Sequence, residues 1–211
     1  MKLFLNEASS AASRVRIALA IKRLEVETQS IGIFGPEAES RQEAYRKINP
    51  QGLVPALVTD DGRLISQSLG IIEYIDELRP EPPLLPSSLV ERALARSVAL
   101  AIASEIHALL PPRVALQLQT AFGATAGSTA DWGRHWVSEG FNAVESLLAS
   151  NRRGAFAITN EPSVADIFLF PQSVGARRLG VDLSSWPHIA DVVTRLETLP
   201  AFTENAPAAR K

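Results

Sequence analysis

The chain has 211 residues, of which 46% are hydrophobic and 21% are charged, and its formal net charge is −2. This balance is typical of a globular protein with a core of useful size, and it excludes a disordered chain or a basic, nucleic-acid-binding one. The chain has no cysteine, which excludes disulfide bonds, thiolate metal sites and a nucleophilic thiol of its own.

Targeting and metal-binding signals are also missing from the sequence. No apolar run approaches the ~18 residues that a membrane span needs, and Met1 opens a strand-like segment rather than a signal peptide. We therefore expect a cytoplasmic protein that binds neither membrane nor nucleic acid. His107, His135 and His188 lack metal-ligand spacing, so no metal site is expected.

Residues 1–80 alternate between strand-like and helix-like segments. Strands are predicted at 2–5, 24–30, 55–59 and 63–66, and helices at 11–22, 37–48 and from Ser68 onward. The Asp61-Gly62 step favours a hairpin between the last two strands. The predicted order is β-α-β-α-β-β-α.

A proline-rich segment then separates two regions of different character. Residues 79–86 include four prolines, which cannot continue a helix and stiffen a linker, here placed at 81–86. Residues 87–211 read as all-helical, with helices at 90–110 and 132–148 and a loop at 123–130. Ser163 and Asp166 form a capping-box pattern that marks a further helix start. The predicted fold class is an α/β domain (1–80) followed by an all-α domain.

Two serines precede the first predicted helix. Ser9-Ser10 lie where free backbone amides and the helix dipole favour an anion, to which a serine hydroxyl can donate. The alternative is that one serine simply caps the helix.

Two further segments could bind a peptide-like ligand. If the Val54-Pro55 bond is cis, the turn exposes the Val54 amide and carbonyl to a ligand that pairs like an added strand; the alternative is an ordinary trans-proline loop. Gln67-Ser68 precede an apolar helix, where Ser68 either caps the helix or receives a ligand carboxylate.

Together these motifs give the sequence a family resemblance. The segment 9–19, SSAASRVRIAL, resembles the serine-serine-cysteine motif and the following arginine-valine-arginine of zeta-class glutathione transferases, which include maleylacetoacetate and maleylpyruvate isomerases. Residues 49–57 are similar to the cis-proline segment of that family, and Gln67-Ser68 to its γ-glutamyl-binding pair. The resemblance implies a thioredoxin-like, glutathione-binding domain followed by a helical substrate domain, in a homodimer.

The resemblance also assigns roles to residues. Ser9 would donate to the glutathione sulfur, with Ser10 as the alternative activator; Val54 would hold the cysteinyl backbone beside Pro55, and Gln67 and Ser68 the γ-glutamyl end. His107 and Arg113 would lie on a helix that faces glutathione, although a lone histidine is also common as a structural residue. Arg177-Arg178 would bind the substrate, unless they form a solvated basic pair. Arg14 and Arg16 are expected to be salt-bridge partners at the surface or an interface.

The sequence departs from the family at two positions. Ala11 replaces the motif cysteine, and Ala8 stands where maleylpyruvate isomerases carry a substrate-binding arginine. Three functions stay open: cis–trans isomerisation of maleylacetoacetate or maleylpyruvate, general glutathione transfer to electrophiles including halogenated acids, and a non-catalytic binding module.

Overall fold

The computed structural model describes residues 1–209, which divide into two compact units. Unit 1 contains Met1–Pro83 and the described residues from Glu204 onward, and unit 2 contains Leu84–Thr203. The sequence alone assigns residues after Thr203 to the helical region, whereas the structure groups those it describes with the N-terminal unit.

Unit 1 is built on a four-stranded sheet in the order β2-β1-β3-β4. Its strands are β1 (Lys2–Leu5), β2 (Glu27–Ser30), β3 (Ala56–Val58) and β4 (Leu64–Ser66). β1 is parallel to β2 and antiparallel to β3, and β3 pairs antiparallel with β4, so the predicted hairpin is confirmed.

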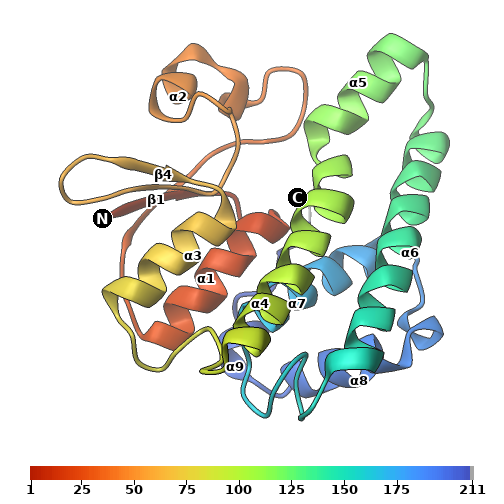
Figure 1. Cartoon of the computed structure of the whole chain (residues 1–211). Helices are drawn as coiled ribbons and strands as arrows, with labels where there is room; N and C mark the ends of the chain where they lie inside the picture. The colour runs from red at the N-terminus through yellow and green to blue at the C-terminus, as the bar shows by residue number, and fades with distance from the viewer. Residues whose placement is uncertain (210–211) are drawn as a thin grey trace. The chain divides into compact units, whose positions relative to one another are not determined.

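Helices lie on both faces of this sheet (Figure 1). They are α1 (Ser10–Lys22), α2 (Glu43–Ile48) after a short 3₁₀ turn, η1 (Glu39–Arg41), and α3 (Ser68–Leu78). Phe4 of β1 packs with Tyr45 of α2. Because side chains alternate along a strand, the buried Leu3 and Leu5 point to the opposite face of the sheet. The predicted single helix at 37–48 is wrong in its first half, because extended Gln42 (ψ 149°) separates η1 from α2.

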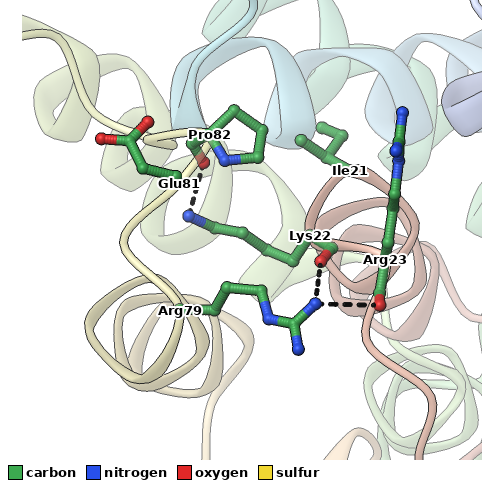
Figure 2. Close-up of a pocket in the computed structure, with 6 residues that line it drawn as sticks. All are labelled: Ile21, Lys22, Arg23, Arg79, Glu81 and Pro82. Carbon is green, nitrogen blue, oxygen red and sulfur yellow. Dashed lines mark hydrogen bonds between the residues drawn. The ribbon is translucent and has the colours of Figure 1, made fainter.

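A buried lysine fixes the start of the proline-rich segment (Figure 2). Lys22, the last residue of α1, is 1% exposed, and its ammonium donates to the carbonyls of Pro80 (3.2 Å) and Pro82 (2.5 Å). The same group pairs with Asp76 at 2.5 Å, so three partners satisfy the three protons of the ammonium. The segment that follows α3 is therefore held against the end of α1.

Unit 2 is helical throughout. Its elements are α4 (Leu89–Leu100), the π-helix η2 (Ala101–Ile106), η3 (His107–Leu109), α5 (Pro112–Phe122), α6 (Ala126–Asn151), α7 (Val164–Arg178), η4 (Leu183–Ser185), α8 (Pro187–Leu196) and α9 (Pro200–Thr203). The first ten residues of α7 are all buried, and α4 and α8 pack against this helix. A helix that is buried on every side is the centre of its core.

Two expectations for unit 2 need correction, and one is confirmed. The predicted loop at 123–130 ends early, because Thr125 and Ser128 form a capping box that starts α6 at Ala126. The predicted helix at 90–110 is not a regular α-helix, since η2 and η3 replace its second half. The predicted capping box is confirmed: Asp166 accepts from the Ser163 amide and hydroxyl at 2.8 and 3.0 Å. Burial raises the pKa of Asp166 to about 6.

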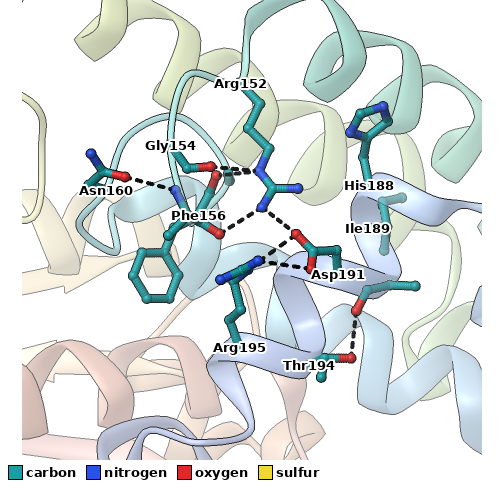
Figure 3. Close-up of polar contacts among 12 residues, drawn as sticks. Arg152, Gly154, Phe156, Asn160, His188, Ile189, Asp191, Thr194 and Arg195 are labelled. Atoms are coloured by element: carbon teal, nitrogen blue, oxygen red, sulfur yellow. Dashed lines mark hydrogen bonds and ion pairs between the residues drawn. The ribbon is translucent and has the colours of Figure 1, made fainter.

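An arginine organises the loop between α6 and α7 (Figure 3). Arg152 donates to the carbonyls of Gly154, Ala155 and Phe156 at 2.8–3.1 Å and pairs with Asp191 of α8 at 2.5 Å. One guanidinium thus joins the loop to a neighbouring helix, as its planar array of donors permits.

The chain contains a longer apolar helical stretch than the sequence reading indicates. Within the described residues, Leu89–Phe122 is long and apolar enough, by length and composition alone, to cross a membrane. Core helices of globular proteins pass the same test, and π and 3₁₀ turns interrupt this stretch. By the criteria of length and composition alone, the expectation that no apolar stretch is long enough to span a membrane is therefore wrong.

Candidate active site

Ser9 is the N-cap residue of α1. Its Oγ accepts a hydrogen bond from the Ala12 amide at 3.2 Å, and its carbonyl accepts from the Ser13 amide at 2.9 Å. Capping uses a lone pair of the hydroxyl oxygen and leaves its hydrogen available to a ligand. The capping role and the donor role considered for Ser9 are therefore compatible.

The start of α1 also offers backbone donors. Within residues 1–209 the Ala11 amide makes no hydrogen bond, and Ser10 occupies the first helical position. No acidic residue lies in the first turn of α1, so the partial positive charge of the helix start is not offset there. An anion beside Ser9 would meet a hydroxyl, an amide and a favourable dipole.

An asparagine shapes the loop that carries Ser9. The Asn6 side chain accepts from the Ala8 amide at 3.0 Å and donates to the Ile31 carbonyl at 2.9 Å, and the Asn6 carbonyl accepts from the Ser9 amide at 3.0 Å. Such an Asx turn fixes the path of the backbone. Sequence reasoning missed Asn6, although an asparagine between a strand and a capped helix is a usable turn signal.

Two side-chain hydrogen bonds fix the loop before β3. Tyr45 Oη and Asn49 Nδ2 both donate to the Leu53 carbonyl at 2.8 Å, and burial raises the pKa of Tyr45 to about 12. Gly52 has φ +62°, and a Cβ there would lie 2.8 Å from the Ser40 carbonyl oxygen, so only glycine fits. The loop reaches Val54 along a fixed path.

Val54 leaves its backbone open at the end of that loop. The Val54-Pro55 bond is cis, which decides between the two alternatives drawn from the sequence. Within the described residues the Val54 amide and carbonyl make no hydrogen bond. Both groups are available to an extended peptide, which could pair with them like an added strand.

Gln67 and Ser68 lie where β4 gives way to α3. Gln67 has φ +69°, a region that non-glycine residues seldom occupy, and its Nε2 donates to Gln51 Oε1 at 3.0 Å. Gln67 is the N-cap residue of α3 and Ser68 its first residue, so the alternative that Ser68 is the N-cap is wrong. A strained residue at a helix start is typical of ligand sites.

Arg14 lies beneath the start of α3 and is 1% exposed. Its Nη1 donates to Ser68 Oγ at 3.4 Å, and burial lowers its pKa to about 9, so the group stays protonated at neutral pH. The expectation that Arg14 lies at the surface is wrong, because the side chain links α1 to α3 inside unit 1. Arg16 does form the expected salt bridge, with Glu7.

The candidate residues of unit 2 lie in separate elements. His107 begins η3 and is half-buried, whereas Arg113 is an exposed residue of α5, and Leu110-Pro111 separate these two elements. The resemblance implies that the two residues lie on one helix, but they do not share a regular helix in this structure.

Arg177 and Arg178, here termed the terminal arginine pair, are exposed at the end of α7. Arg177 forms an ion pair with Glu197 just after α8, with side chains 44% and 39% exposed. An exposed pair of this kind is weak, so a carboxylate ligand could displace Glu197.

Comparisons with known proteins agree with this geometry. Residues 8–78 match the family described as "Glutathione S-transferase, N-terminal domain". The chain is 39% identical to maleylacetoacetate isomerase of Pseudomonas aeruginosa over 208 residues, which cover 99% of the chain and 96% of that protein.

Two solved structures superpose on the whole chain. The holo structure of maleylpyruvate isomerase, described as a bacterial zeta-class glutathione S-transferase, has TM-score 0.93 and 37% identity, and covers 100% of this chain and 98% of its own. Maleylacetoacetate isomerase of Methylobacterium extorquens AM1, with bound malonate and glutathione, has TM-score 0.94, 32% identity and the same coverages.

The fold is therefore the glutathione transferase fold, with an N-terminal thioredoxin-like domain and a helical C-terminal domain. The chain belongs to the maleylacetoacetate and maleylpyruvate isomerase family of zeta-class glutathione transferases.

Proposed function

We propose that this protein uses glutathione to isomerise a maleyl oxo-acid, maleylacetoacetate or maleylpyruvate, from cis to trans. The observation that carries the proposal is the open start of α1, where the Ser9 hydroxyl hydrogen and the Ala11 amide are both available to an anion. Relatives of 37–39% identity that bear these isomerase names support it.

The site has to ionise a thiol. A free thiol has a pKa of about 8.5, and lowering it by about two units requires roughly 2.7 kcal/mol of preferential stabilisation of the thiolate. A hydroxyl hydrogen bond to a charged acceptor contributes ~1.5–3 kcal/mol, and a helix start contributes ~0.3–1 kcal/mol. Ser9 at the start of α1 is thus sufficient, and its hydroxyl need not ionise.

Docking of glutathione follows from the other two segments of unit 1. The cysteinyl backbone pairs with the Val54 amide and carbonyl beside Pro55, and the γ-glutamyl end is bound by Gln67 and Ser68 at the start of α3. The buried charge of Arg14 behind Ser68 favours the γ-glutamyl carboxylate. We also propose His107 and Arg113 as glutathione-binding residues.

The reaction itself is addition followed by elimination. The thiolate adds to the cis carbon–carbon double bond, a carbon–sulfur bond forms, and the π electrons move onto the conjugated oxo group. The former double bond is now single and rotates. The electrons return, the carbon–sulfur bond breaks, and the trans isomer leaves with glutathione regenerated.

The terminal arginine pair supplies the charge that the carboxylates of the substrate require. The two departures from the family bear on this step. Because Ala8 stands in place of an arginine, the loop before Ser9 lacks one positive charge. We therefore infer that the substrate of this protein makes fewer carboxylate contacts than the substrate of maleylpyruvate isomerases. Ala11 leaves the activating hydroxyl in place, because Ser9 contacts the sulfur.

Titration calorimetry and an ultraviolet isomerisation assay test the proposal. Glutathione should bind to the folded protein, and both maleyl substrates should be isomerised only in its presence. Binding of glutathione with conjugation of halogenated acids but no isomerisation would favour a general transferase. Failure to bind glutathione at millimolar concentration would contradict every catalytic version and favour a binding module.

We also propose that the protein acts as a cytoplasmic homodimer in aromatic amino acid catabolism, with unit 1 as the glutathione domain and unit 2 as the substrate domain. Large apolar side chains that are exposed in the single chain support dimerisation, among them Leu89 (83%), Val90 (67%) and Phe122 (77%). Light scattering coupled to gel filtration should give twice the chain mass.

A further inference from the structure

The last described residues of the chain fold back onto the start of α1. Residues 204–208, here termed the C-terminal strap, follow α9 and belong to unit 1, and Pro207 within them is buried. Chain ends are usually poorly ordered unless specific contacts hold them. The contacts of this strap converge on a few residues around Ser9.

Two side chains of α1 hold the strap by its backbone. Ser13 Oγ donates to the Asn205 carbonyl at 2.5 Å, and the Ser13 side chain is fully buried. Arg16 Nη2 donates to the carbonyls of Asn205 and Ala206, both at 3.2 Å. The acceptors in these contacts are backbone carbonyls. The contacts therefore fix the path of the strap and do not depend on its side chains.

The strap in turn holds the loop that carries Ser9. The Ala208 amide donates to the Glu7 carbonyl at 2.8 Å. Arg16 contacts the same carbonyl at 3.4 Å and forms an ion pair with the Glu7 carboxylate. Glu7 lies two residues before Ser9, and Asn6 fixes the other side of the turn.

We propose that Arg16 and the C-terminal strap position the Ser9 hydroxyl for thiol activation, so that the end of the chain is a working part of the glutathione site. This inference rests on the proposed function. Arg16 is a positioning residue, since it acts through Glu7 rather than on the sulfur. A displacement of about 1 Å in such a loop can cost ~100-fold in rate.

A pair of proline substitutions tests the inference with a matched control. Ala208→Pro removes the one amide that binds the Glu7 carbonyl, and Ala208 is exposed, so the fold should survive. Ala209→Pro, one residue later, removes an amide that makes no hydrogen bond within the described residues. A second pair compares a chain ending at Thr203 with one ending at Ala209.

The readout is the pKa of the bound glutathione thiol, measured from ultraviolet thiolate absorbance against pH, together with kcat and the KM for glutathione. Ala208→Pro and the chain ending at Thr203 should raise this pKa by about one unit and lower kcat about threefold at neutral pH, with the KM little changed. Arg16→Lys, which keeps the charge but not the fork of donors, should have an intermediate effect. Both controls should match the parent protein.

The outcomes separate this inference from the proposed function. If the parent protein binds glutathione with a lowered thiol pKa, and Ala208→Pro leaves that pKa and kcat within about twofold of the parent, the positioning role is wrong while the proposed function stands. If the parent protein does not bind glutathione, both are wrong. If the chain ending at Thr203 fails to fold, the comparison of Ala208→Pro with Ala209→Pro still tests whether the strap positions Ser9.

Discussion

Replacement of Ser9 by alanine is the sharpest test of the chemistry at the start of α1. The Ser9 hydroxyl already accepts the Ala12 amide at 3.2 Å, so the remaining hydrogen is the part that the sulfur can use. Loss of ~1.5–3 kcal/mol of hydrogen bonding to the thiolate corresponds to a rise of about 1–2 units in the thiol pKa.

The effect on turnover depends on pH. If the bound thiol has a pKa of about 6.5, about three quarters of it is thiolate at neutral pH, and the substitution lowers that share to between roughly 20% and 2%. Turnover at neutral pH should therefore fall about 4- to 40-fold and recover toward the parent value as the pH rises above the new pKa.

Capping has to be separated from activation. Ser9→Ala also removes the N-cap of α1, at a cost of ~0.5–2 kcal/mol, whereas glycine at this position costs only a few tenths. Ser9→Gly should therefore lose the same activity as Ser9→Ala with a smaller loss of thermal stability, and Ser10→Ala should lose less activity than either. A turnover that is unchanged in Ser9→Ala, or a deficit that does not close at high pH, would refute the role of Ser9.

Three further predictions concern unit 2. Burial raises the folded-state pKa of Asp166 from 3.8 to about 6, so its contribution to stability is fully present below the unfolded pKa and is lost as the pH rises through about 6. The difference in unfolding free energy between the parent and Asp166→Asn should shrink across this window, and a difference that grows would show that the ionised carboxylate is the stabilised form. A Cβ on Gly140 would overlap the buried Ile106 side chain of η2, so Gly140→Ala should cost ~1–3 kcal/mol by denaturant unfolding, while Gly127→Ala in the same helix should be neutral or stabilising. Alanine at both residues of the terminal arginine pair should weaken inhibition by dicarboxylates without changing the affinity for glutathione. If the affinities for dicarboxylates and for glutathione both equal those of the parent protein, the pair is merely solvated.

Local sequence signals predict much of unit 1 and one helix start of unit 2. The Asp61-Gly62 hairpin, the order of strands and helices, and the capping box at Ser163 and Asp166 each depend on residues close in sequence. The start of α6 escapes prediction because Thr125 and Ser128 do the capping inside a stretch of small residues that reads as a loop. Short-range chemistry can be inferred where its residues are neighbours and their types are distinctive.

Long-range placement is what the sequence cannot supply. Arg14 and Arg16 are two positions apart, yet one is buried against Ser68 of α3 and the other binds a strap nearly two hundred residues later. Nothing in a charged residue type indicates burial, because arginine is usually exposed. The contacts between the strap and the Ser9 loop also cannot be predicted from sequence, because they use backbone atoms that any residue would provide.

The C-terminal strap has a practical consequence for anyone who expresses this protein. An affinity tag, fluorophore or surface linker added after Lys211 would be joined only a few positions beyond the Ala208 amide that holds Glu7. At the other end, the amino group of Met1 pairs with Asp60 beside the hairpin turn, away from Ser9 in sequence and at the far end of β1. Fusions intended to leave catalysis undisturbed therefore belong on the amino terminus.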